Sequence, residues 1–91
     1  MRFYLDHRPA VRSFLDGLTL SRLGRISLFY TLHALRTVSD AERLNPANRV
    51  GPYFVFRRTF REKGRLVPIR FVVDDGPAAY GVLRVVFVDL T

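Results

Sequence analysis

The chain of 91 residues is long enough for one small domain with a single hydrophobic core and too short for two. Hydrophobic residues make up 48% of the sequence and charged residues 25%, which is the composition of a folded chain and argues against disorder. Fourteen arginines and one lysine stand against eight acidic residues and give a net charge of +7. This balance favours an anionic partner such as nucleic acid, an acidic protein or a membrane surface.

Several functional classes are excluded by residues that the sequence lacks. Without cysteine there are no disulfides, thiol nucleophiles or thiolate metal sites. No apolar run is long enough to span a bilayer, and "MRFYLDHRPAV" at the N-terminus has no apolar signal core. His7 and His33 lie far apart without ligand spacing. We therefore expect a cytoplasmic protein with no metal, no cofactor and no membrane partner.

The N-terminal part predicts a strand followed by two helices. "RFYL" over Arg2–Leu5 is short and aromatic, as is typical of a strand. Pro9 suits the first turn of a helix, which we expect to end at Gly17. Thr19 or Ser21 can then cap a longer helix, which we expect to reach about Val38.

The C-terminal part predicts three strands. The prolines, asparagines and glycine of Ser39–Pro52 indicate the end of a helix and then a loop. Apolar and aromatic runs then predict strands over Tyr53–Arg61, Arg65–Asp74 and Val82–Leu90. The order β-α-α-β-β-β predicts an α+β fold in a single domain, 1–91. We expect a small antiparallel or mixed sheet of four strands, with an αα-hairpin packed on one face.

A tight turn at Lys63 and Gly64 would fix the register between the first two of these strands. One face would then be apolar, while on the other Arg57 would lie directly opposite Arg70. Two like charges in that position cost a few tenths of a kcal/mol, roughly, unless solvent or an anion screens them. The pair therefore indicates a surface with a function.

The last strand should extend this surface. Alternation predicts that Leu83, Val85 and Phe87 join the core, which leaves Arg84 on the second face beside Arg70. Tyr80 precedes the strand and is a candidate for stacking. The predicted surface contains Arg57, Arg61, Arg70 and Arg84, whose guanidinium groups suit contacts with phosphate. The competing interpretation is that positive side chains protect edge strands from aggregation, and that Arg58, on the apolar parity, only snorkels at the edge of the core.

Three segments, "FLDGL", "YFVFRRTFREKGRLVPIRFVVDD" and "GVLRVVFV", together with the element order, resemble the toxins of the RelE and ParE superfamily. The resemblance covers nearly all of the chain and rests on layout. It implies the toxin of a bacterial toxin–antitoxin pair, neutralised by a small acidic antitoxin protein. The RelE branch cuts messenger RNA on the ribosome, and the ParE branch poisons DNA gyrase.

Residue by residue, the resemblance extends to the sheet arginines. Arg57 or Arg58, Arg70 and Arg84 match the phosphate-holding positions of the ribonuclease branch, which makes Arg70 and Arg84 the candidates for a catalytic role. That branch continues past its last strand into a segment with a catalytic Tyr or His, whereas this chain reads "VDLT" there. Endoribonuclease activity, gyrase inhibition and a binding module without chemistry therefore stay open, as does a homodimer.

Overall fold

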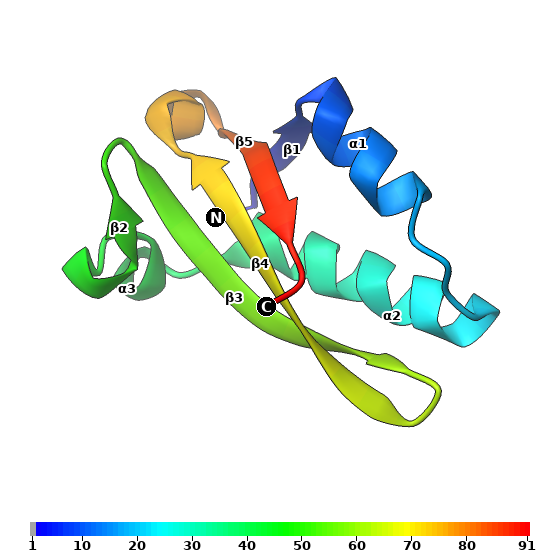
Figure 1. The fold of residues 1–91 in the computed structure, drawn as a ribbon. Helices are drawn as coiled ribbons and strands as arrows, with labels where there is room; N and C mark the ends of the chain where they lie inside the picture. Colours follow the sequence, from blue (N-terminus) through cyan, green and yellow to red (C-terminus); the bar gives the residue numbers. More distant parts are fainter. Residues whose placement is uncertain (1) are drawn as a thin grey trace.

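Two long segments of strand lie in front of the longest helix and form the body of the molecule (Figure 1). The computed structural model describes residues 2–91. Its helices are α1 (Pro9–Asp16), α2 (Arg22–His33) and α3 (Asp40–Arg43). Its strands are β1 (Tyr4–His7), β2 (Arg49–Val50), β3 (Tyr53–Glu62), β4 (Arg65–Asp74) and β5 (Val82–Asp89).

The strands form one mixed sheet in the order β1-β5-β4-β3-β2. β1 runs parallel to β5, and the other pairs are antiparallel. The predicted α+β class is confirmed. The prediction of four strands is wrong, because β2 adds a fifth strand at the edge of the sheet. No helix within residues 2–91 has both the length and the apolar character needed to cross a membrane.

The ends of α1 and α2 are set by residues that favour helix termini. Pro9 occupies the first turn of α1, and Gly17 follows its last residue. The Ser21 hydroxyl caps α2 by accepting a hydrogen bond from the Gly24 N–H at 3.0 Å. α2 ends sooner than predicted, and its direction continues as a 3₁₀ turn over Ala34–Thr37.

The segment 39–52, predicted to be a helix end and a loop, contains three short elements: α3, a 3₁₀ turn over Pro46–Asn48, and β2. The Ser39 hydroxyl caps α3 by accepting from the Glu42 N–H at 3.1 Å. β2 is only two residues long and pairs with the start of β3 across the turn at Gly51 and Pro52. Elements this short have no period that a sequence pattern could reveal.

The core lies between the helices and one face of the sheet. Four phenylalanines of β3 and β4 are at its centre, each almost fully inaccessible to water, and each contributes about 2 kcal/mol of burial free energy. Its buried members include Phe54, Phe56, Phe60, Phe71, Leu83 and Val85 from the strands, with Val11, Leu15, Leu28 and Leu35 from the helices and the following turn. The expected packing of both helices on one face is therefore confirmed.

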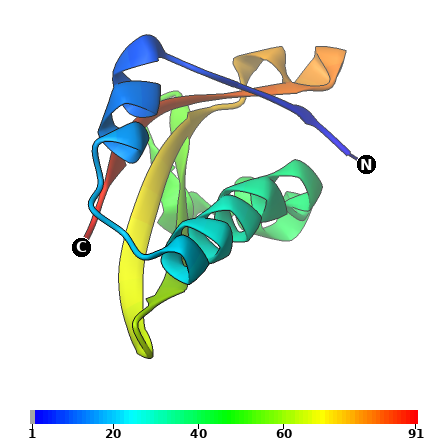
Figure 2. The same cartoon turned by 90° about the vertical axis from the view of Figure 1, so that its right-hand side faces the viewer.

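The β3–β4 hairpin has the register that its turn predicts. Lys63 has a φ of 49° and Gly64 a φ of 75°, as in a type I′ turn. Phe56 pairs with Phe71, and Arg57 pairs with Arg70. The long hairpin extends to this turn past the rest of the sheet (Figure 2).

β5 departs from simple alternation. Val73 pairs with Val85 but Val72 pairs with Phe87, so that Val86 is an extra residue in a β-bulge. Beyond the bulge the faces exchange, and Phe87 is exposed while Val88 is buried. The prediction that Phe87 joins the core is therefore wrong.

Candidate functional site on the open sheet face

The side chains of β3, β4 and β5 alternate between the core and the face turned away from α1 and α2, which we call the open face. Register shows how its residues are arranged in rows across the strands. Its members, by their places in the strands, are Val55, Arg57, Thr59, Arg61, Leu66, Pro68, Arg70, Val72, Asp74, Arg84, Phe87 and Asp89.

Arg57 and Arg61 are the open-face cations without an acidic partner. Both are exposed, and within the described residues neither forms an ion pair. The only hydrogen bond of the Arg57 side chain in that part of the chain is a long one of 3.5 Å, which its Nη1 donates to Asn48 Oδ1. Both guanidinium groups are thus available to an anion from outside.

Arg70, in contrast, is already engaged. Its Nε donates to Asp89 Oδ1 at 3.0 Å, and its Nη2 donates to Asp89 Oδ2 at 2.7 Å. These hydrogen bonds and the nearby carboxylate raise the pKa of Arg70 above its ordinary value. A phosphate that binds Arg70 must therefore compete with Asp89.

Arg84 lies elsewhere on the sheet than the sequence predicts. It pairs with Asp74, whereas Arg70 pairs with Asp89, so the two arginines are separated along the sheet. The Arg84 Nε donates to Asp6 Oδ2 of β1 at 2.9 Å, a hydrogen bond that lowers the pKa of Asp6. The predicted alignment of Arg84 beside Arg70 is therefore wrong. The loop between β4 and β5 follows no turn rule from which the register of β5 could be predicted.

Arg58 is on the opposite face from Arg57. Its Nη1 and Nη2 each donate to a carboxylate oxygen of Glu42 in α3 at 2.7 Å, and its guanidinium carbon lies 3.9 Å from the centre of the Phe56 ring. This contact closes the core edge with an ion pair and a cation–π interaction. Arg58 is therefore not part of the open face, and its competing assignment to the core edge agrees with these contacts.

Tyr80 is separated from the arginine pair. It ends the 3₁₀ turn over Gly76–Tyr80 and is almost fully exposed at the end of the sheet remote from the β3–β4 turn. The aromatic ring that the structure does place beside the arginines is Phe87. Sequence reasoning missed it because nothing in "GVLRVVFV" marks the bulge.

Positive charge gathers at one side of the open face. Arg57 and Arg61 of β3 are unpaired, while the β4–β5 side carries Arg70 and Arg84 in ion pairs with Asp89 and Asp6. Near the hairpin turn, Arg61 lines a hollow together with Arg22, Leu23 and Lys63. The positive potential of the sheet is therefore strongest along β3 and towards the turn.

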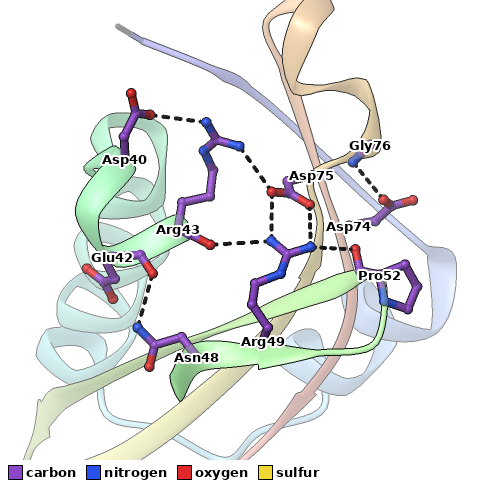
Figure 3. A network of polar contacts seen from close by, with 9 residues as sticks. All are labelled: Asp40, Glu42, Arg43, Asn48, Arg49, Pro52, Asp74, Asp75 and Gly76. Carbon is purple, nitrogen blue, oxygen red and sulfur yellow. Dashed lines mark hydrogen bonds and ion pairs between the residues drawn. The ribbon is translucent and has the colours of Figure 1, made fainter. Parts of the chain in front are cut away.

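A second cluster of arginines has a structural role. Asp75 accepts hydrogen bonds from Arg49 Nη1 at 2.9 Å, Arg49 Nη2 at 3.2 Å and Arg43 Nη1 at 3.1 Å (Figure 3). Burial raises the pKa of Asp75, but the hydrogen bonds from Arg49 and Arg43 outweigh burial and lower it. The network ties α3 and β2 to the end of β4.

The outer side of α2 is apolar and exposed. Leu23, Ile26, Phe29 and Tyr30 recur at helical spacing and face solvent, with 77% of Leu23 and 69% of Tyr30 exposed. Phe29 stacks on His33 with ring centres 4.0 Å apart and lines a hollow of about 310 Å³ between α1 and α2. Such a stripe on a surface helix indicates an interaction site.

Comparison of the chain with protein families, with curated proteins and with solved structures finds no match. Its function is therefore inferred from its own residues.

Proposed function

We propose that the chain is the toxin-like component of a bacterial toxin–antitoxin pair that acts in the cytoplasm, and that its open face binds RNA. The observation that carries this proposal is the cross-strand pair of Arg57 and Arg70, in which Arg57 has no carboxylate partner among the described residues. A like-charged pair opposes folding unless an anion screens it. Phosphate is the anion that we propose, because guanidinium groups bind it with two parallel hydrogen bonds.

The topology supports the same proposal. β1, α1 and α2, followed by the short α3 and β2, precede an antiparallel β3–β4–β5 arrangement, and β1 lies beside β5. A strand, a helical pair and an antiparallel sheet are the layout that the resemblance to the RelE and ParE superfamily implies. The proposal thus rests on two independent observations, the layout of the elements and the charged surface of the sheet.

The geometry favours RNA binding over RNA cleavage. Arg70 and Arg84 were the candidates for stabilising charge at a reacting phosphate, which requires both to converge on it. Instead they occupy different rows of the open face, and each is held by a carboxylate. We therefore assign to the open face the binding of an RNA backbone, with Arg57 and Arg61 as its contacts.

Growth after induced expression in a bacterial host tests this function. The natural chain should arrest growth, and the double variant Arg57→Ala, Arg61→Ala at the same soluble level should not. A double variant of two exposed arginines near the start of α1, Arg8→Ala and Arg12→Ala, removes the same charge and should still arrest growth. Equal arrest by all three chains would reject the open face, and no arrest by the natural chain would reject the toxin assignment.

The exposed stripe of α2 favours a second function, the binding of an acidic protein. Leu23 and Tyr30 present apolar surface, and Arg22 and Arg25 lie beside them on the same helix. We propose an acidic amphipathic helix as the occupant, because carboxylates at its edges would complement these arginines and the chain's net charge of +7. Within a toxin–antitoxin pair this helix would belong to the antitoxin, and DNA gyrase is the alternative protein partner.

A designed peptide can test this docking site. An amphipathic helical peptide with leucines at i, i+3 and i+7 flanked by glutamates should bind the natural chain. Leu23→Ser with Tyr30→Ser should weaken binding at least tenfold, whereas Arg57→Ala should have little effect, because Arg57 lies away from the hollow that Arg61 shares with Leu23. Loss of peptide binding only in the arginine variant would place the protein partner on the open face instead.

A further inference from the structure

Phe87 occupies a position that a phenylalanine in a small protein would ordinarily avoid. It lies two residues before the end of β5 and pairs with Val72 of β4, yet 51% of its surface is exposed on the open face. Regular alternation would have buried it beside Leu83 and Val85. The bulge at Val86 turns it outward, and bulges of this kind often redirect a side chain at a functional site. The fold therefore loses part of the burial free energy of this aromatic ring, which lies on the open face instead.

The register defines what surrounds the ring. Phe87 pairs with Val72, which in turn pairs with Val55, so that an apolar row crosses the sheet. The adjacent row contains Arg57, Arg70 and Asp89. β3 and β5 are separated by two strand spacings, or about 10 Å. An arginine on β3 and the ring on β5 are thus close enough to contact the phosphate and the base of neighbouring nucleotides.

The charges determine how a nucleotide would be oriented across the sheet. Asp89 neutralises Arg70 beside the ring, whereas Arg57 is unpaired on β3. A phosphate is therefore attracted to β3. An uncharged base can lie over Val72 and Phe87, which are the accessible members of the apolar row, since Val55 is buried. Bases stack readily on exposed aromatic side chains of a sheet when they are not paired with another strand. Bases within a duplex are paired and cannot reach such a ring.

We infer that Phe87 is a stacking platform for an unpaired base of a single RNA strand whose phosphates contact Arg57 and Arg61. This inference rests on the proposed binding of RNA by the open face and adds to it the class of RNA and the residue that selects it. Selection is for strandedness, because the ring contacts a base that only a single strand exposes.

Fluorescence offers a direct test, since the natural chain contains no tryptophan. In the variant Phe87→Trp the new indole is the only one, and stacking on a base should quench its emission. An unstructured eight-nucleotide RNA should quench it, and so should single-stranded DNA of the same sequence, because the ring contacts only the base. Duplex RNA at the same nucleotide concentration should not. Phe29→Trp on α2, at a site that is 55% exposed, is the matched control and should stay unquenched.

Affinity measurements separate the platform from the proposed function. Phe87→Ala should weaken single-strand binding about 5- to 150-fold, and Phe87→Tyr should restore it. Because no charge is lost, Phe87→Ala should leave the salt dependence unchanged, whereas Arg57→Ala with Arg61→Ala should reduce it.

Four outcomes would overturn the inference. Equal quenching of the Phe87→Trp variant by duplex and single strand, or quenching only by an acidic helical peptide, would show that the ring is not a platform for an unpaired base. If Phe87→Ala binds as tightly as the natural chain while the arginine variant does not, the platform is wrong and RNA binding by the open face stands. If the natural chain binds no strand, both proposals fail.

Discussion

Arg70 and Asp89 form a two-pronged ion pair between β4 and β5, with donor–acceptor distances of 3.0 and 2.7 Å. Asp89 thereby occupies the guanidinium fork that a phosphate would use on Arg70. Arg57, directly across from Arg70, has no such carboxylate in the described part of the chain. The cross-strand pair of Arg57 and Arg70 thus combines one available arginine with one that is internally neutralised.

Removal of this carboxylate should strengthen RNA binding. In Asp89→Asn the fork of Arg70 becomes available for one more phosphate contact. The slope of log affinity against log salt for single-stranded RNA should then steepen by about 0.7. Fluorescence anisotropy at several salt concentrations measures this slope. Asp16→Asn, which removes the partner of Arg12 on α1, is the control. An equal change in both variants would mean that only net charge matters.

Arg57 and Arg58 are adjacent in sequence, but their substitution should have different effects on the free energy of unfolding and on RNA binding. Arg58→Ala removes the contacts with Glu42 and Phe56 and should lower the free energy of unfolding by about 1 kcal/mol, a value discounted because Arg58 is partly exposed. Arg57→Ala should leave the free energy of unfolding nearly unchanged and weaken RNA binding. Urea denaturation and RNA titration of both variants give the comparison. A larger loss of RNA affinity in Arg58→Ala would contradict the assignment of the two faces.

Asp75 should make stability depend on acid pH. Its pKa in the folded chain is below the ordinary value of 3.8 despite burial, because Arg49 and Arg43 donate to it. A lowered pKa means that its stabilisation is complete above 3.8 and is lost as pH falls through the folded-state value. Asp75→Asn should therefore cost about 2 kcal/mol at neutral pH and progressively less in acid. Urea denaturation of both chains across this range tests the trend, and a constant difference would contradict it.

Glu62 offers a test of the contact between the hairpin and α2. Its carboxylate accepts hydrogen bonds from the Ser21 hydroxyl and from the Ser21 N–H, the latter at 2.8 Å, and these bonds lower its pKa. A methyl group at Gly24 would overlap the Glu62 carboxylate and displace it. Gly24→Ala should thus return the pKa of Glu62 towards its ordinary value of 4.5. NMR titration of the Glu62 side chain measures this, and an unchanged pKa would show that the methyl group is accommodated.

The lowered pKa of Glu62 has its own effect on stability. The hydrogen bonds from Ser21 stabilise the folded chain fully above 4.5 and less as the pH falls through the lowered value. Gly24→Ala should reduce this part of the acid dependence without removing the cap itself, which depends on the Ser21 hydroxyl and the residue 24 N–H.

Turn chemistry made the centre of the fold predictable. Lys63 and Gly64 adopt positive φ values in a two-residue turn, and that turn fixes every pair of the β3–β4 register, including Arg57 with Arg70. The sequence therefore predicted the part of the candidate site that lies on β3 and β4. The long apolar strands and the helix signals at Pro9 and Ser21 likewise gave the class and the layers.

The remainder depends on tertiary contacts that leave no local pattern. The loop before β5 does not set a register, so neither the pairing of Arg70 with Asp89 nor that of Arg84 with Asp6 could be derived. A bulge adds one residue without changing composition, and it reversed the predicted face of Phe87.

The most direct test of the account is the salt dependence of single-stranded RNA binding by the natural chain and by Arg57→Ala with Arg61→Ala. If both arginines contact phosphates, the slope of log affinity against log salt should be shallower in the variant by about 1.4. The Arg8→Ala, Arg12→Ala chain, with the same net charge, should keep the natural slope. An unchanged slope in the open-face variant, or an equal loss in the control, would show that the open face does not hold the RNA backbone.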